Sequence, residues 1–208
     1  MNIKKSLASD AMQNWYDYIT IMKDVVPQGH IEELMLATND KEAAVAATVI
    51  NKDDNGNDNQ ETNFNHRVTV NYIMPDKLMD DLHASIENLY VSHIKNRYGC
   101  EAKRFESIQF LGYPVGGHYI KHNDSETYFD GKWDRMAPRD ISLIFYLNEE
   151  FGGGELEFPD LGLTIKPKRG MMVAFPSYKE FAHKVHPVTW GYRYSLVSWI
   201  ETEKRIYG

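Results

Sequence analysis

Two side chains that bind metals stand two positions apart in the middle of the chain, at His122 and Asp124. If this segment is a β-strand, the spacing places both side chains on one face of the strand. An imidazole and a carboxylate side by side provide two corners of a metal site. A third ligand has to come from another part of the chain.

A candidate for that third ligand, His183, follows Asp124 by 59 residues. The intervening sequence contains enough strand-like segments to bring His183 back across a barrel. Two histidines and one carboxylate on one face of a metal leave the opposite face open to other molecules. This ligand set is typical of non-haem Fe(II) oxygenases.

Arg193 and Ser195 lie ten and twelve residues after His183. A guanidinium group suits a carboxylate because its N–H groups can reach both oxygens. The two-residue spacing places the Ser195 hydroxyl on the same strand face. We therefore expect this pair to hold the distal carboxylate of a small dicarboxylic acid.

The region from about Arg104 to Thr202 resembles the catalytic domain of the 2-oxoglutarate- and Fe(II)-dependent oxygenases, and among them the prolyl 4-hydroxylase type. A His-x-Asp pair alone is weak evidence in a chain with 8 histidines, whereas an ordered series of motifs is specific. The matching residues are Tyr113, Gly116, Tyr119, His122 and Asp124, then Tyr146-Leu147-Asn148, Gly153-Gly154-Glu155, Pro167 with Gly170, Phe175-Pro176, and the block from His183 to Ser195.

The resemblance assigns roles to these positions. His122, Asp124 and His183 would bind Fe(II), and Arg193 would pair with the C5 carboxylate of 2-oxoglutarate. It also implies O2 as the second substrate, with ascorbate as an accompanying reductant. The pocket for 2-oxoglutarate would include Tyr113, Tyr146, Ser195 and Trp199, although the three aromatic residues could instead be core residues.

The activity implied by the resemblance is hydroxylation of an unactivated C–H bond, coupled to decarboxylation of 2-oxoglutarate to succinate and CO2. Asp124 agrees with hydroxylation, because related halogenases have a small residue at that position. The first substrate to consider is a peptidyl proline. A free amino acid, another side chain or a small metabolite would need the same chemistry, and a jelly-roll binding module without catalysis is the alternative from a different class.

The segment between Asp124 and Ile141 is rich in aromatic and charged residues. In the family this region often forms a mobile lid over the substrate. We hypothesise that Tyr128, Trp133 and Arg135 contact a peptide there. The alternative is that Trp133 packs on the barrel.

Several short strands must position these residues. The strand candidates are Phe105 to Tyr113, His118 to His122, Asp140 to Leu147, Glu155 to Phe158, Leu163 to Lys166, Met171 to Phe175 and Tyr192 to Ile200. Short strands at this spacing suggest a barrel or a sandwich. The resemblance narrows the fold to a mainly β double-stranded β-helix, a distorted jelly roll, with N-terminal helices packed on one sheet.

The first half of the chain is predicted to form helices and strands that support this core. We expect a strand over Trp15 to Ile21, a helix from Pro27 through Met35, a strand over Val68 to Ile73, and a long helix from Pro75 to about Tyr98 that stops at Gly99. Residues 51–65 are rich in Asn, Asp and Gly and predict a loop. Residues 1–103 are then a support region and 104–208 the catalytic core, within one integrated domain 1–208.

Composition limits the partners. The chain has 208 residues with a formal net charge of −7, which disfavours non-specific binding to nucleic acid. Among the oxygenases that this chain resembles, the nucleic-acid demethylases have a second arginine six residues after the first. At that position, six residues after Arg193, this chain has Trp199. Cys100 is the single cysteine, so no intramolecular disulfide is possible.

Residues 1–10 show no signal peptide, and no apolar run is long enough to span a membrane. We therefore expect a cytoplasmic protein. The sequence does not predict its oligomeric state.

Overall fold

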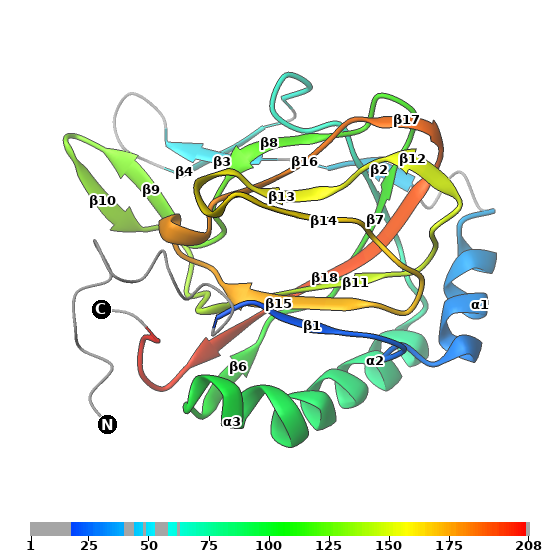
Figure 1. Cartoon of the computed structure of the whole chain (residues 1–208), viewed down its shortest axis with the longest axis horizontal. Helices are drawn as coiled ribbons and strands as arrows, with labels where there is room; N and C mark the ends of the chain where they lie inside the picture. Colours follow the sequence, from blue (N-terminus) through cyan, green and yellow to red (C-terminus); the bar gives the residue numbers. More distant parts are fainter. Residues whose placement is uncertain (1–17, 40–43, 48, 53–57, 62, 207–208) are drawn as a thin grey trace.

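The computed structural model describes residues 18–39, 44–47, 49–52, 58–61 and 63–206. Residues 1–10, and Trp15 at the start of the first expected strand, lie outside the described residues. Within the described parts, no helix is both long and apolar enough to cross a membrane. Figure 1 shows two layers of strands, with helices beneath one of them.

The first part of the described chain alternates short strands with helices. Proline precedes both longer helices, at Pro27 and Pro75, where the missing N–H costs no helical hydrogen bond. The second helix continues through a π-helical turn, Tyr90–Ile94, and stops at Gly99, whose φ of +64° is the left-handed cap that we expected. The bounds are β1 Thr20–Met22, α1 Gln28–Ala37, β2 Ala44–Ala46, β3 Val49–Lys52, β4 Asp58–Glu61, β5 Val70–Tyr72, α2 Asp76–Leu89 and α3 Lys95–Tyr98.

The rest of the chain is almost entirely β-structure. Two single turns of 3₁₀-helix, Pro159–Leu161 and Lys179–Phe181, interrupt it. The strands are β6 Ala102–Phe105, β7 Gln109–Tyr113, β8 Tyr119–His122, β9 Glu126–Phe129, β10 Lys132–Arg135, β11 Ile141–Tyr146, β12 Phe151–Gly153, β13 Leu156–Phe158, β14 Leu163–Ile165, β15 Met172–Pro176, β16 His183–Val185, β17 Val188–Gly191 and β18 Arg193–Thr202.

The larger sheet has the order β1-β15-β11-β18-β7-β5-β2, and β6 also pairs with β18. Its pairings are antiparallel throughout. Strands from the N-terminal half, β1, β5 and β2, therefore extend the same sheet that the C-terminal half builds. The smaller sheet has the order β14-β13-β16-β8, and β12 pairs with β17 beside it.

Alternation along the strands produces two hydrophobic layers. On β11, Leu143 and Phe145 point to one side, where they join the buried face of α2, including Leu82. Ile144 and Tyr146 point to the other side, into the space between the two sheets. Successive side chains of a strand face opposite ways, so one sheet can support helices on one side and a site on the other. The mainly β jelly roll with helices on one sheet is confirmed.

Three local expectations differ from the structure. Part of the expected loop 51–65 is strand, because β4 pairs with β3 from Val49↔Glu61 to Lys52↔Asp58. Pairing of this kind uses backbone groups, which an Asn- and Asp-rich composition does not rule out. The expected strand Phe105 to Tyr113 is broken into β6 and β7. The segment expected to be a lid contains a regular hairpin, β9–β10.

Candidate metal and cosubstrate site

The three expected metal ligands meet between the two sheets. His122 ends β8, Asp124 follows closely, and His183 begins β16. Strands β8 and β16 are antiparallel neighbours in which His183 lies opposite His122, so pairing removes the long separation in sequence. One ligand atom from each of the three residues lies within 4.8 Å of the others.

Backbone carbonyl groups orient both imidazoles. His122 Nδ1 lies 2.8 Å from the carbonyl oxygen of Ile120, and His183 Nδ1 lies 3.1 Å from that of Phe181. Each Nδ1 therefore carries the proton and donates it, which leaves Nε2 with a free lone pair. The two Nε2 atoms lie 3.6 and 3.8 Å from oxygens of Asp124, so they face the same point as the carboxylate.

The carboxylate of Asp124 is fixed by a serine from the larger sheet. Ser142 on β11 donates its hydroxyl proton to Asp124 Oδ2 over 2.6 Å. The Oγ atoms of Ser142 and Ser177 are 2.8 Å apart, and the backbone N–H of Asp124 donates to the carbonyl oxygen of Ser177. The acidic ligand is thus held at both its side chain and its backbone.

The protonation states also suit a metal. Burial and the neighbouring His183 lower the pKa of His122 well below its ordinary value. Burial raises the pKa of Asp124, but His183, His122 and Arg139 together lower it further than burial raises it. A neutral imidazole and an ionised carboxylate are the forms that bind a metal ion.

Arg193 lies at the start of β18, with its guanidinium between the two sheets. It is 1% exposed, and its guanidinium carbon lies 4.4 Å from the ring centroid of Tyr113 and 5.0 Å from that of Tyr146. Nη1 donates to Ser195 Oγ over 3.2 Å. The structure therefore brings Arg193 and Ser195, whose spacing suggested a pair, together with Tyr113 and Tyr146, which the family resemblance placed beside them.

Buried polar atoms in this group have no partner. In the described part of the chain, Arg193 Nε, Tyr146 Oη and Trp199 Nε1 make no hydrogen bond, and the partner of Arg193 Nη1 is the Ser195 hydroxyl and not a carboxylate. Burial also raises the pKa of Tyr146 to about 12, so its hydroxyl stays a neutral donor. An unpaired buried cation is costly, and a bound carboxylate would remove that cost. The residues present therefore fit a small dicarboxylate cosubstrate.

A cavity of about 420 Å³ joins the metal ligands to Arg193. Tyr113, Ser195 and Trp199 line it, whereas Tyr146 is not among its lining residues and lies against the Arg193 guanidinium. The guanidinium carbon of Arg139 sits 3.6 Å above the Trp199 ring, and Arg139 itself pairs with Glu106. Trp199 is therefore both buried and part of the wall.

The residues expected to contact a substrate separate into two groups. Tyr128 and Trp133 face each other across the β9–β10 hairpin with ring centroids 5.4 Å apart, and both line the outer part of the cavity. Arg135 does not line the cavity: its Nε donates to the carbonyl oxygen of Ala137 and its Nη2 pairs with Asp140. Arg135 and Trp133 share a face of β10, so it is the ion pair with Asp140, and not the alternation of the strand, that holds Arg135 outside the cavity lining; its contact with a substrate remains a prediction.

Comparison with known families adds to this geometry. Residues 108–201 match the model of the 2OG-Fe(II) oxygenase superfamily. All three candidate metal ligands and Arg193 lie within these matched residues. Residues 108–201, a little under half of the chain, are thus similar to a 2OG-Fe(II) oxygenase domain.

Curated relatives of this oxygenase resemble it over part of their length. It is 35% identical over 104 residues to a PKHD-type hydroxylase of Aliarcobacter butzleri, covering 48% of this chain and 45% of that protein. It is 39% identical over 66 residues to prolyl 3-hydroxylase 2 of Mus musculus, covering 29% of this chain and 9% of the relative. The matches thus span less than half of these relatives.

A solved structure resembles the oxygenase over nearly its whole length. It is a prolyl hydroxylase from Trichoplax adhaerens in complex with a hypoxia inducible factor oxygen degradation domain peptide fragment. The TM-score is 0.67 and the identity 17%, with 94% of this chain and 89% of that chain covered. This likeness shows the fold.

Three residues of the oxygenase site were not singled out in the sequence, and a fourth, Tyr119, was given no role there. The Tyr119 ring stacks on His122 with 3.5 Å between centroids, and the Arg67 guanidinium carbon lies 4.9 Å from the Tyr119 ring centroid. Ser142 holds Asp124, and Arg139 covers Trp199. Tyr119 belongs to the family motif, but the other three become visible only when distant strands pair.

The two nearby histidines have other partners. His118 Nδ1 lies 2.9 Å from the carbonyl oxygen of Gly116. His186 is hydrogen-bonded through Nε2 to Glu157 on β13. Neither joins the group of three ligands in the described residues.

Proposed function

We propose that this chain is a dioxygenase that uses Fe(II), 2-oxoglutarate and O2 to hydroxylate an unactivated C–H bond, with peptidyl proline as the first substrate to test. One observation carries the proposal: His122, Asp124 and His183 converge within 4.8 Å at the base of a cavity whose other end contains the buried Arg193. A metal site and a carboxylate site therefore line one and the same cavity.

The protein's own residues supply position and environment. Fe(II), when bound, supplies the O2 and electron-transfer chemistry that no side chain can provide. The carbonyl groups of Ile120 and Phe181 aim the two Nε2 atoms, and Ser142 aims the carboxylate. Arg193 and Ser195 would orient the distal carboxylate of 2-oxoglutarate, and the Tyr146 ring would hold the guanidinium from behind.

A substrate larger than 2-oxoglutarate fits the form of the cavity. Its outer part is lined by Tyr128 and Trp133, which are 60% and 45% exposed. Half-exposed aromatic residues beside an opening suit an extended peptide with an apolar, cyclic side chain such as proline. The prolyl hydroxylases among the relatives and the peptide complex of the structural neighbour support this choice of substrate class.

The proposal is tested by succinate formation. The full chain is assayed with Fe(II), ascorbate, O2 and 2-oxoglutarate against a panel of proline-containing peptides, free proline and no substrate, and mass spectrometry locates any added oxygen. We expect a peptide to raise succinate formation well above the no-substrate rate and to be hydroxylated on proline. Stimulation by free proline alone would favour a small-molecule hydroxylase instead, and a panel without stimulation contradicts the prolyl assignment.

Two further points belong to the same proposal. Ascorbate would act as a reductant that restores Fe(II) after uncoupled turnover, so its omission should shorten the active phase without changing the initial rate. A cytoplasmic location is part of the proposal, because a single cysteine fits a reducing compartment.

A further inference from the structure

The two ends of the β9–β10 hairpin lie side by side. In the antiparallel register, Glu126 at the start of β9 is the Cα partner of Arg135 at the end of β10. Tyr128 and Trp133 are also partners in this register, and their rings stand at the mouth of the cavity. Whatever holds Glu126 and Arg135 therefore sets the position of the two aromatic rings.

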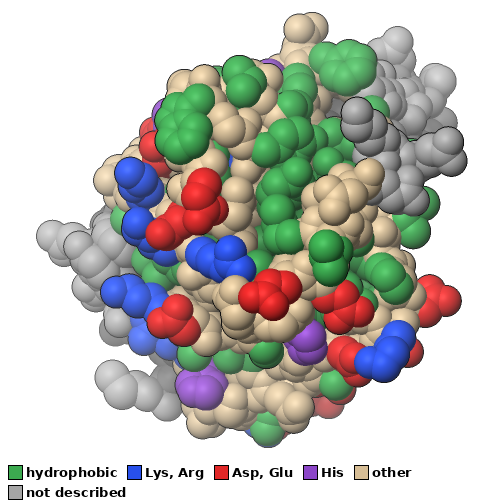
Figure 2. All heavy atoms as spheres, turned by 90° about the vertical axis from the view of Figure 1, so that its right-hand side faces the viewer, with side chains coloured by type: hydrophobic (Ala, Val, Ile, Leu, Met, Phe, Trp, Pro, Cys, Tyr) green, Lys and Arg blue, Asp and Glu red, His purple; other side chains and the backbone are tan. Residues whose placement is uncertain are grey.

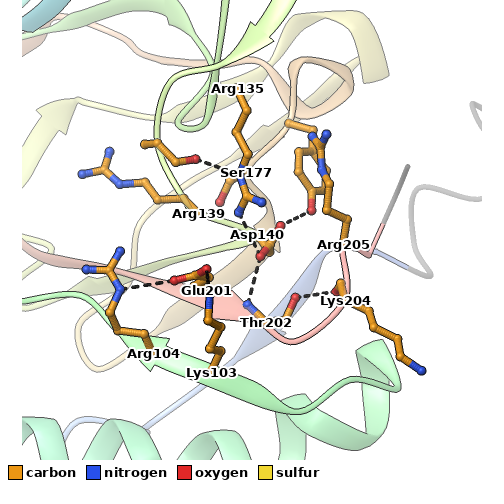
Figure 3. A network of polar contacts seen from close by, with 12 residues as sticks. Lys103, Arg104, Arg135, Arg139, Asp140, Ser177, Glu201, Thr202, Lys204 and Arg205 are labelled. Atoms are coloured by element: carbon orange, nitrogen blue, oxygen red, sulfur yellow. Dashed lines mark hydrogen bonds and ion pairs between the residues drawn. The ribbon is translucent and has the colours of Figure 1, made fainter. Parts of the chain in front are cut away.

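Arg135 is held by a buried carboxylate. Its Nη2 lies 3.1 Å from Asp140 Oδ2, and the Asp140 side chain is 1% exposed. Asp140 also accepts a hydrogen bond from the backbone N–H of Thr202 on β18 and a short one from the Tyr178 hydroxyl. Figure 3 shows Arg135 and Thr202 converging on Asp140, with Arg205 alongside. The end of the hairpin is thus tied to separate segments of the core.

Glu126 is held by the C-terminal segment. Arg205 Nη2 lies 2.9 Å from Glu126 Oε1, and the Arg205 guanidinium carbon lies 4.8 Å from the ring centroid of Tyr178. The other oxygen, Glu126 Oε2, accepts the backbone N–H of Lys179 over 3.0 Å. The Lys179 ammonium in turn lies 5.3 Å from the ring centroid of Trp133.

These contacts close into a circuit around the base of the hairpin. The order is Glu126, Arg205, Tyr178, Asp140 and Arg135, and Arg135 returns to Glu126 through the strand pairing. Each carboxylate of the circuit has an arginine as its partner. Burial and the bond to Asp140 raise the pKa of Tyr178, which keeps its hydroxyl protonated as a donor. Of these five residues, Glu126 alone lines the cavity.

We propose that Asp140 and Arg205 are positioning residues that hold the β9–β10 hairpin, and with it the Tyr128–Trp133 pair, docked over the cavity before a substrate arrives. The hairpin is then a standing wall of the substrate site. A substrate would meet two aromatic rings that are already in place, so binding would not require the hairpin to be ordered first.

The test uses Arg205, which lies outside the cavity and is reached by solvent. The three variants of the full chain are Arg205→Ala, Arg205→Lys as the conservative rescue, and Arg104→Ala as the control. Arg104 forms a similarly exposed ion pair with Glu201 on β18, away from the hairpin. Backbone hydrogen exchange is measured for peptides covering 126–135 and for peptides covering β11 and β18.

In Arg205→Ala, exchange within residues 126–135 should be about tenfold faster while β11 and β18 keep the wild-type rate. Arg205→Lys should recover most of the protection, and Arg104→Ala should match wild type. Unchanged exchange in the hairpin of Arg205→Ala overturns the proposal. Equally faster exchange in all peptides overturns it too, because Arg205 would then stabilise the fold in general. Asp140→Asn, which keeps the shape and removes the charge, should give the same local effect.

An activity measurement adds the functional consequence and rests on the proposed function. For a peptide that the enzyme hydroxylates, Arg205→Ala should raise the peptide KM about tenfold while kcat changes little, because the hairpin positions and does not react. A lowered kcat at constant KM contradicts the positioning role. The exchange measurement needs no substrate, so it decides the role of Arg205 even if no hydroxylated peptide is found.

Discussion

At the scale of single residues, the site depends on which atom of each ligand is free. The carbonyl groups of Ile120 and Phe181 occupy the Nδ1 atoms of the two histidines, so both Nε2 atoms remain for a metal. Ser142 does the equivalent for Asp124 by occupying one oxygen from the larger sheet. Hydrogen-bond partners of this kind set the geometry and basicity of the metal ligands. Substituting such a partner should therefore change metal affinity, as substituting a ligand does.

Ser142→Ala should weaken metal binding while leaving the fold intact. Loss of a hydrogen bond to a ligand carboxylate typically lowers metal affinity roughly 10- to 100-fold. Anaerobic calorimetric titration with Fe(II) measures the change. The matched control is Ser198→Ala, because Ser198 is also buried and donates to a carbonyl oxygen, that of Glu106, away from the ligands. Equal affinities in the two variants would contradict the role of Ser142.

Some residues of the candidate site can be predicted from the sequence, and others cannot. His122, Asp124, His183 and Arg193 could be chosen because their spacing and the surrounding motif are specific. Ser142 could not, since its function comes from the pairing of β11 with strands far away in sequence. For Arg135 the residue type suggested a substrate contact, whereas in the structure its guanidinium pairs with the buried Asp140, a partner that the sequence does not reveal.

At the scale of elements, short turns bring the backbone close to the site. Gly154 follows β12 with a φ of +67°, and a Cβ built there would lie 2.9 Å from Arg193 Cδ and 3.0 Å from Phe151 Cε2. The glycine therefore meets two requirements, a left-handed backbone and the absence of a side chain beside the cosubstrate arginine. Gly162 has a similar φ of +63°, but a Cβ at that position would meet no atom within 4 Å.

Gly154→Ala should impair binding of 2-oxoglutarate, and Gly162→Ala should not. Both variants carry the backbone cost of a left-handed alanine, about 1 kcal/mol, so both should lose similar stability from this source. Only Gly154→Ala crowds Arg193, and we expect its Kd for 2-oxoglutarate to rise roughly tenfold or more. Thermal unfolding and anaerobic titration with 2-oxoglutarate separate the two effects. Identical affinities for 2-oxoglutarate would contradict the packing argument.

The hairpin gives a second prediction at this scale. Trp133→Ala should raise the substrate KM, because the ring forms part of the wall at the cavity mouth. Trp190→Ala is the control, since Trp190 is 58% exposed on β17 and does not line the cavity. Steady-state kinetics with the hydroxylated peptide decide the matter: the expected result is a several-fold higher KM in Trp133→Ala alone. An unchanged KM would mean that Trp133 only packs on the barrel.

The sequence predicts most strands of the second half, because apolar alternation and Gly or Pro boundaries mark them. It does not predict the β9–β10 and β3–β4 hairpins, whose polar and aromatic residues hide the pairing. It also joins β6 and β7 into one strand, because both are extended and the break between them changes no residue pattern. These elements are formed by hydrogen bonds between backbone groups, whereas sequence composition describes only the side chains.

At the scale of the whole molecule, one sheet serves both halves of the chain. Its outer face packs on α1 and α2, and its inner face carries Arg193, Ser195 and Trp199 toward the cavity. Strands β1, β5 and β2 from the N-terminal half extend the same sheet. Figure 2 shows how hydrophobic side chains also reach the surface at one end of the molecule, among charged neighbours. Because the helices and the site lie on opposite faces of this one sheet, we expect them to unfold together.

Leu82→Ala tests that cooperativity. Leu82 lies on α2 and is 3% exposed against the sheet, so its truncation should lower the free energy of unfolding by about 2–5 kcal/mol. Leu36→Ala, the same change at a side chain that is 69% exposed, should have little effect. Calorimetry should show one transition shifted as a unit. Separate melting of the helices, with the main transition unmoved, would contradict one integrated domain.

We propose that His122, Asp124 and His183 bind Fe(II) next to a 2-oxoglutarate site built on Arg193. The most direct test of this claim is the anaerobic visible spectrum of the full chain with Fe(II) and 2-oxoglutarate, compared with Asp124→Ala. We predict that the wild-type protein develops the weak charge-transfer band of the iron–2-oxoglutarate chelate and that the variant does not. A wild-type spectrum without this band at saturating Fe(II) and 2-oxoglutarate, indistinguishable from that of the variant, would contradict the claim and favour a binding module without catalysis.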